Sequence, residues 1–187
     1  CKMIIFKLFL SLFKIIQDFN ISPNKLKQIS FNIFMKDMKN YHFTIDEMHE
    51  ALINIKKQIN KTEWFPEQIL SVNRGGCVPG VYLSHAINVP HKVLDVQLRY
   101  DNNNPNLEVL RKSIISSSNI LIIDDINDTG ATFEFIKKSY DSRVTNIRYA
   151  ALIDNISSSF KVNFRGKKID KSSDSTWIIF PWEKEIG

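Results

Sequence analysis

The sequence predicts an α/β fold, a mostly parallel and twisted β-sheet flanked by helices. Short apolar stretches that indicate strands alternate with stretches of helical periodicity, and such βαβ units build parallel sheets. The stretch Ile120–Ile123 is apolar at every position, as expected for a strand buried on both faces of a parallel sheet.

The 187 residues suffice for one domain with a full core, and the regular pattern starts only after residue 40. We therefore predict a domain over residues 41–187 and an N-terminal extension over residues 1–40 that lies outside the functional fold. Within the extension, the apolar segment Met3–Ile16 contains two lysines and is short for a membrane span. It is typical of a signal-like or amphipathic segment, and no membrane contact is expected of the main domain.

The first predicted helix begins after Thr44. Thr44 and Glu47 match a capping box, in which each side chain can bond to the backbone N–H of the other residue. Beyond it, apolar residues recur near helical spacing. They are Ile45, Met48, Leu52, Ile55 and Ile59.

The rest of the chain alternates between apolar runs and segments rich in glycine or polar residues. A glycine-rich turn is predicted at Asn73–Gly80 and an exposed polar loop at Asp101–Asn106. We predict strands at Gln68–Val72, Lys92–Leu98, Ile120–Ile123 and Asn146–Ile153, and helices that include Val81–Ile87 and residues 132–140.

Composition narrows the possible partners. Hydrophobic and charged contents of 43% and 24% are ordinary for a globular protein. The net charge is +5 but the lysines are scattered, so we predict a solvated surface and no nucleic-acid partner. The two cysteines, Cys1 and Cys77, form no disulfide framework or zinc pattern, and a reducing, cytoplasmic compartment is expected.

Three carboxylates cluster where the apolar strand ends, at Asp124, Asp125 and Asp128. Open α/β folds bind their ligands beyond the carboxyl ends of the strands. Carboxylates there can bind a metal, act as acid or base, or accept hydrogen bonds from sugar hydroxyls.

The turn Thr129–Thr132 helps to choose among these uses. It leads into a helix, so its backbone N–H groups and the helix dipole can hold an anion, and Gly130 permits backbone geometry that a side chain would block. Acidic residues just before such a cradle would repel a polyphosphate. They suit a ribose whose 5′-phosphate lies in the cradle, so the pattern indicates a pentose-phosphate site.

ILIIDDINDTGAT, residues 120–132, closely resembles the phosphoribosyl-pyrophosphate (PRPP) signature of type I phosphoribosyltransferases. SVNRGGCVPGVYLSHAINVP, residues 71–90, resembles the S-R-G-G-L-V-P-G segment of xanthine–guanine phosphoribosyltransferases, and TWIIFPWE, residues 176–183, resembles their T-W-I-x-x-P-W-D end. The resemblance is collinear over about residues 41–187. It implies the type I phosphoribosyltransferase fold with a small C-terminal hood. It also implies transfer of phosphoribose from PRPP to a nucleobase, with a purine expected, as in purine salvage.

The resemblance also implies the residues that bind PRPP. The pyrophosphate would bind at Arg74, Gly75 and Gly76, with a cis peptide bond between Asn73 and Arg74. The ribose hydroxyls would bind Asp124 and Asp125, and the 5′-phosphate would bind Thr129, Gly130, Ala131 and Thr132.

Catalysis and base binding are implied in the same way. Asp128 would handle the proton at N7 of the base, and Arg74 would stabilise the departing charge. Trp177 would stack on the base, whose edge would be read by the backbone of Ile178.

One position departs from the family pattern. Xanthine–guanine enzymes have a lysine that donates to the 6-oxo group of the base, and here Asp154 aligns with it. An ionised carboxylate cannot donate. Three explanations stay open: the alignment is displaced, Lys161 or Lys167 donates instead, or Asp154 reads a base that carries an amino group.

The remaining expectations concern the cofactor and the assembly. Mg²⁺ is expected to bridge pyrophosphate and ribose hydroxyls, with Asp125 as a contact mainly through the substrate. We expect the loop around Tyr100–Asn103 to close over the site. We also expect the protein to be a homo-oligomer, either a dimer or a tetramer.

The alternative function is that of a non-catalytic regulator that senses PRPP or nucleotides. A phosphoacceptor receiver domain also pairs acids at a strand end, but it has no role for the D-T-G-A-T turn.

Overall fold

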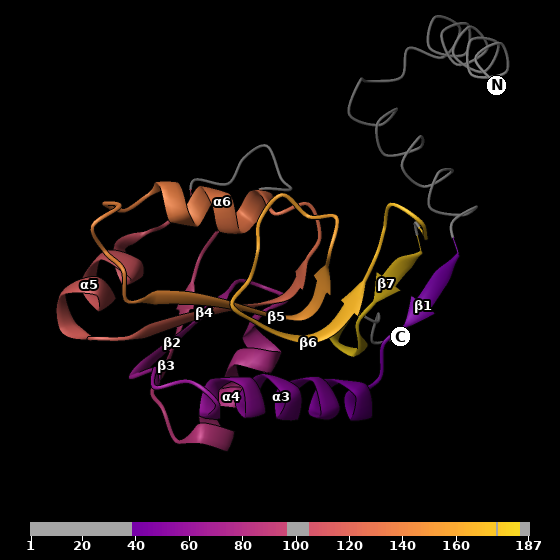
Figure 1. Ribbon diagram of the computed structural model, residues 1–187, viewed down its shortest axis with the longest axis horizontal. Coiled ribbons are helices and arrows are strands. Elements are labelled where there is room, and N and C mark those ends of the chain that lie inside the picture. The colour runs from indigo at the N-terminus through magenta and orange to yellow at the C-terminus, as the bar shows by residue number, and fades with distance from the viewer. Residues whose placement is uncertain (1–38, 97–104, 175, 184–187) are drawn as a thin grey trace, which may run out of the picture. The chain divides into compact units, whose positions relative to one another are not determined.

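The computed structural model describes residues 39–96, 105–174 and 176–183 (Figure 1). The predicted N-terminal extension lies outside the described residues except for its last two positions, and its separation from the domain stays a prediction. No helix of the described part is long and apolar enough to cross a membrane. The described elements are β1 (Asn40–His42), α3 (Ile45–Asn60), β2 (Gln68–Val72), α4 (Cys77–Ile87), β3 (His91–Leu94), α5 (Glu108–Ser116), β4 (Ile120–Asn127), α6 (Ala131–Lys138), β5 (Ile147–Asn155), β6 (Phe164–Ile169), β7 (Trp177–Ile179) and the 3₁₀ turn η1 (Pro181–Glu183).

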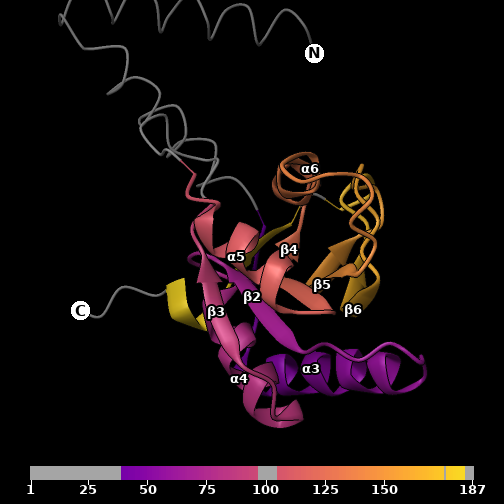
Figure 2. The same ribbon diagram turned by 90° about the vertical axis from the view of Figure 1, so that its left-hand side faces the viewer.

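Within the described residues, five parallel strands form the main sheet in the order β3-β2-β4-β5-β6. Helices α3 and α4 pack on one face of the sheet, and α5 and α6 pack on the other. Each face has its own apolar core. Figure 2 shows α3 and α4 on the opposite side of the sheet from α6. The predicted α/β class is confirmed.

Strand β4 lies at the centre of the sheet. Ile120 and Ile122 pack in the core under α5 and α6, while Leu121 and Ile123 pack in the core under α3 and α4. All four side chains are fully buried. Burial of one such side chain stabilises the fold by about 1.5–3 kcal/mol. The core therefore holds the carboxyl end of β4 in place.

Helix α3 starts at the predicted capping box, in which Thr44 accepts from the backbone N–H of Glu47 at 3.1 Å. Four of the five predicted apolar positions are buried, but Ile45 in the first turn is 41% exposed. Farther along, the Gln58 amide donates to the Arg165 carbonyl at 2.6 Å and accepts from its N–H at 3.2 Å. These bonds satisfy backbone groups at the outer edge of β6.

Strand β7 pairs in parallel with β1, and these two strands form a separate sheet. Phe43 beside β1 and Phe180 beside β7 join it to the core under α3, with ring centroids 5.4 Å apart. The role of this segment as a hood stays a prediction.

Several element boundaries differ from the sequence analysis. Helix α4 already begins at Cys77, so Pro79 and Gly80 belong to its first turn, where proline is tolerated. Strand β4 continues through both acidic residues to Asn127. The elements β1, α5, β6 and β7 were not predicted, and each has nine residues or fewer. Most of the predicted polar loop, Asp101–Asn106, lies outside the described residues.

Candidate active site

The acidic pair lies inside the last part of β4 rather than after it. Asp124 and Asp125 are only 9% and 8% exposed, and the backbone N–H of Asp125 donates to Oδ1 of Asp124 at 2.9 Å. Their position at the carboxyl edge of a parallel sheet is where α/β folds bind ligands.

The Arg-Gly-Gly turn between β2 and α4 packs directly against this pair. A Cβ atom at Gly75 would lie 1.9 Å from Oδ2 of Asp125, and one at Gly76 would lie 2.6 Å from the Ile123 carbonyl oxygen. A side chain at position 75 would have to displace the Asp125 carboxylate, and one at position 76 would collide with backbone atoms. The cis peptide bond between Asn73 and Arg74, implied by the resemblance, is confirmed. The turn and the acidic pair therefore form one site.

The charge of the acidic pair also affects the start of α4. Burial, together with the negative charges of Asp124 and Asp125, raises the pKa of the Cys77 thiol. A thiol in this field stays protonated at neutral pH and is a poor nucleophile. The raised pKa thus gives no support for a nucleophilic role of Cys77.

The turn after β4 is held by the loop that follows β5. Gly130 has φ 95°, and a Cβ atom there would lie 2.6 Å from the Phe160 nitrogen. The backbone N–H and Oγ of Ser159 both donate to the Thr129 carbonyl, at 3.1 and 2.8 Å. Helix α6 starts at Ala131, directly after this glycine, so the turn predicted to bind an anion does lead into a helix start.

Asn155, at the end of β5, connects two parts of the site and was missed in the sequence analysis. Its side-chain amide donates to the Asp128 carbonyl at 2.8 Å, and its Oδ1 accepts from the backbone N–H of Lys171 at 3.0 Å. Oδ1 also accepts from Oγ of Ser157 at 2.7 Å. Because Asn155 is only 6% exposed, these bonds are shielded from water.

Lys171 was also missed, and it brings Asp128 and Trp177 together. Its Nζ lies 3.1 Å from Oδ1 of Asp128 and 5.6 Å from the centroid of the Trp177 ring. The side chains of Lys171 and Asp128 are 17% and 26% exposed, so the pair is partly shielded. A charged pair thus borders the aromatic ring predicted to stack on the base.

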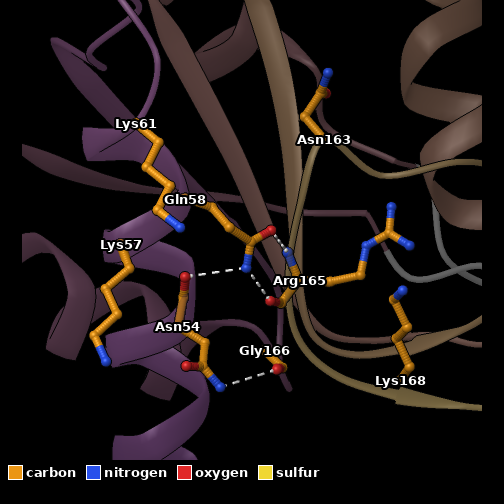
Figure 3. Close-up of a pocket in the computed structure, with 8 residues that line it drawn as sticks. All are labelled: Asn54, Lys57, Gln58, Lys61, Asn163, Arg165, Gly166 and Lys168. Carbon is orange, nitrogen blue, oxygen red and sulfur yellow. Dashed lines mark hydrogen bonds between the residues drawn. The ribbon is translucent and has the colours of Figure 1, made fainter.

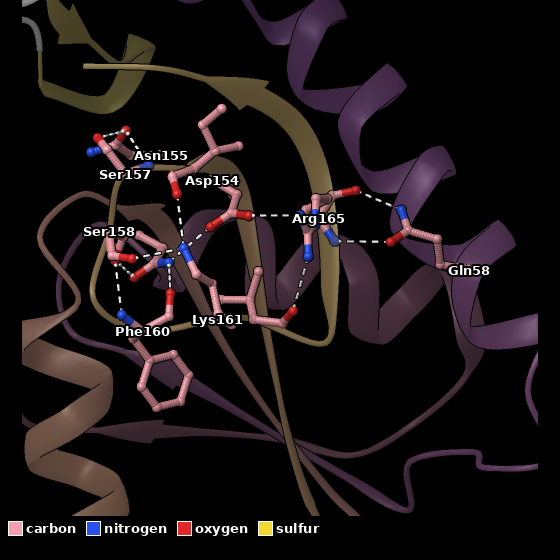
Figure 4. Close-up of polar contacts among 11 residues, drawn as sticks. Gln58, Asp154, Asn155, Ser157, Ser158, Phe160, Lys161 and Arg165 are labelled. Carbon is pink, nitrogen blue, oxygen red and sulfur yellow. Dashed lines mark hydrogen bonds and ion pairs between the residues drawn. The ribbon is translucent and has the colours of Figure 1, made fainter. Parts of the chain in front are cut away.

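Asp154 is engaged elsewhere. Its side chain is 3% exposed; Oδ1 accepts from the Asn127 amide at 2.8 Å, and Oδ2 lies 3.2 Å from Nη1 of Arg165 (Figure 4). We therefore do not include this carboxylate in the proposed base site.

The two alternative lysine donors are engaged as well. Nζ of Lys161 donates to the carbonyls of Ile156 and Ser158 at 2.8 and 2.9 Å (Figure 4). Nζ of Lys167 lies 3.1 Å from Oε1 of Glu47. Lys171 therefore differs from both in lying beside Trp177.

A hollow of about 680 Å³ lies away from this site, along α3 and the edge strand β6 (Figure 3). None of the predicted site residues lines it, and the Lys57 and Arg165 side chains point in different directions. It offers no convergent set of ligand groups. The lining residues are Asn54, Lys57, Gln58, Lys61, Asn163, Arg165, Gly166 and Lys168.

In the part of the chain that the structure describes, no three His, Cys, Asp or Glu side chains are grouped to hold a metal ion. Asp124 and Asp125 can still contribute to a site completed by a ligand, because Mg²⁺ is commonly held by one or two carboxylates together with substrate phosphates.

The family model of the phosphoribosyl transferase domain matches residues 44–186. The chain belongs to this family. Solved structures share the fold of this chain at low identity. The purine phosphoribosyltransferase of Pyrococcus horikoshii is 23% identical, with a TM-score of 0.59 over 80% of this chain and 97% of that one. The xanthine–guanine–hypoxanthine phosphoribosyltransferase of Helicobacter pylori is 21% identical, with a TM-score of 0.61 over 78% and 93%. A hypothetical protein of Neisseria gonorrhoeae with bound ppGpp is 17% identical, with a TM-score of 0.62 over 80% and 92%.

Proposed function

We propose that this protein transfers the phosphoribosyl group of PRPP to a purine base, giving a nucleoside 5′-monophosphate and pyrophosphate. One observation carries the proposal. The Arg-Gly-Gly turn meets the acidic pair at the carboxyl edge of the sheet, where a Cβ atom at Gly75 would lie 1.9 Å from Asp125. The likeness to the purine phosphoribosyltransferase of Pyrococcus horikoshii and the xanthine–guanine–hypoxanthine phosphoribosyltransferase of Helicobacter pylori supports the choice of base class.

In this proposal, the donor extends along the edge of the sheet. Asp124 and Asp125 accept hydrogen bonds from the ribose hydroxyls, and Thr129–Thr132 at the start of α6 bind the 5′-phosphate. Arg74 is exposed and, with the backbone of Gly75 and Gly76, binds the pyrophosphate. This arrangement orients C1′ toward the base side of the site.

The reaction forms a bond between N9 of the base and C1′ and breaks the bond between C1′ and the pyrophosphate oxygen. Negative charge grows on the pyrophosphate, and Arg74 stabilises it. The proton at N7 passes to the Asp128 carboxylate. Trp177 and the backbone of Ile178 hold the base in line.

Mg²⁺ is the expected cofactor, and the substrate would hold it for the most part, with Asp125 as a further contact. When bound, it supplies charge neutralisation at the pyrophosphate. The residues Tyr100–Asn103 lie outside the described part of the chain, so closure by this loop stays a prediction. A homo-oligomeric state and a cytoplasmic location also stay predictions.

The direct test is incubation with PRPP, Mg²⁺ and each of guanine, xanthine, hypoxanthine and adenine, with mass spectrometry of the products. A nucleoside monophosphate that requires PRPP supports the proposal. Binding of PRPP by calorimetry without any product would favour the alternative, a regulatory sensor. Replacing Asp124 and Asp125 together with Ala is expected to abolish PRPP binding, and retained affinity would contradict their ribose role.

A further inference from the structure

On the base side of the proposed site lies the cationic side chain of Lys171, a residue that the sequence analysis did not predict there. Lys171 lies between β6 and β7, outside the strand end where the resemblance implies a lysine. Asn155 accepts from its backbone N–H at 3.0 Å, and its Nζ lies 3.1 Å from Asp128. Lys171 is thus held both at its backbone and at its ammonium group.

We propose that Lys171 is a specificity-determining residue that donates a hydrogen bond to the oxo group at C6 of the purine. The proposal rests on the proposed function. In a purine, N7 and the C6 substituent lie on the same edge of the ring system. A base that presents N7 to Asp128 therefore presents its C6 substituent to the group beside Asp128, which is Lys171.

The position of Nζ over the Trp177 ring fits this role. Nζ lies over this ring, 5.6 Å from the centroid, and so beside the aromatic group on which the base is proposed to stack. In this proposal, the ammonium group contacts the edge of the bound base. It can then contact both the oxo group and Asp128.

The chemistry of the ammonium group sets the expected preference. A lysine ammonium has three N–H donors and no acceptor, so it pairs with an oxo group. The 6-amino group of adenine is itself a donor, so it meets the N–H donors of the ammonium group and cannot accept from them. Sites built around one hydrogen bond reject analogues that cannot make it.

The test compares the full-length protein with its Lys171→Met and Lys168→Met variants, using PRPP, Mg²⁺ and either hypoxanthine or adenine. Lys168 is exposed on β6 and serves as the control for loss of a lysine charge. The unmodified protein is expected to prefer hypoxanthine. Lys171→Met is expected to lower the ratio of kcat/KM for hypoxanthine over adenine by about tenfold or more, the usual effect of losing a hydrogen bond from a charged group. Lys168→Met is expected to keep the ratio.

A second measurement does not depend on turnover. Calorimetric affinity for inosine monophosphate is expected to fall in Lys171→Met about as much as the ratio does, while affinity for ribose 5-phosphate stays within about twofold. An unchanged ratio with unchanged nucleotide affinity in Lys171→Met overturns the inference and leaves the proposed function standing. Failure of the unmodified protein to form any nucleotide overturns the proposed function and the inference with it.

Discussion

Gly75 lies in the turn between β2 and α4 and Asp125 lies in β4, yet a Cβ atom on Gly75 would lie 1.9 Å from Oδ2 of Asp125. The residue type at position 75 is therefore set by a carboxylate fifty positions later in the chain. Asp125 is 8% exposed, so it has little room to move away. The turn and the acidic pair depend on each other for their geometry.

Replacing Gly75 with Ala tests this dependence. The new methyl group must displace the Asp125 carboxylate, so the affinity for PRPP, measured by calorimetry, is expected to fall about tenfold or more. Ser173→Ala, at an exposed position in the loop before β7, is the control for handling and folding. Retained affinity in a folded Gly75→Ala protein would show that Asp125 does not bind the ribose.

Asp128 is the proposed base for the proton at N7. Asp128→Asn keeps the side-chain shape but removes the negative charge, so turnover is expected to fall about tenfold or more, toward the ~10²–10⁴-fold range of general acid–base catalysis. Steady-state kinetics at saturating PRPP measures the effect. Unchanged kcat would end this assignment, whatever the change in KM.

Asn155 is a positioning residue in this scheme, because it contacts the backbone of both Asp128 and Lys171. Asn155→Ala is expected to lower kcat/KM about tenfold to 10²-fold. It is also expected to reduce the preference for hypoxanthine over adenine, because Asp128 and Lys171 each lose a hydrogen bond that holds their backbone in place. Ser157→Ala is the matched control because it removes one bond to the same Oδ1 and leaves the contacts with Asp128 and Lys171. Loss of stability without a change in base preference would contradict the positioning role.

The sequence predicted those parts of the site whose residues are adjacent in the chain. The run from Ile120 to Thr132 contains a buried strand, two acids and a helix start, so local chemistry alone indicates a ribose-phosphate site. The helix after Thr44 was predictable for the same reason, because its cap and its apolar spacing are local signals.

The base side could not be predicted, because its contacts join distant segments. Lys171 meets Asp128 forty-three positions away only after β5, β6 and the loop before β7 are folded. Asp154 was assigned to base binding because it aligns with a family lysine, but it pairs with Arg165 on the neighbouring strand. Strand β6 was missed since its sequence, FRGKKI, mixes cations with a glycine that packs against Ala51 of α3.

Glu47 joins the start of α3 to Tyr41 in β1 and Lys167 in β6. It accepts from the Thr44 N–H at 3.0 Å, lies 3.1 Å from Nζ of Lys167 and accepts from the Tyr41 hydroxyl. Partial burial raises the pKa of Glu47, but hydrogen bonds from Tyr41, Thr44 and Lys167 outweigh it and lower the pKa from 4.5 to about 2. The folded protein therefore releases this proton more readily than the unfolded chain does.

This pKa difference predicts how Glu47→Gln changes stability with pH. A lowered carboxyl pKa stabilises the fold above about pH 4.5, and the contribution is lost as the pH falls toward 2. Urea denaturation at pH 7, 4 and 2.5 should show the variant less stable at pH 7, with the difference shrinking as the pH falls. The effect should be modest because the group is partly exposed and screened. Glu50→Gln, exposed on the same helix, should follow the unmodified protein at all three pH values, and a Glu47→Gln difference that stays constant with pH would contradict the ion-pair role.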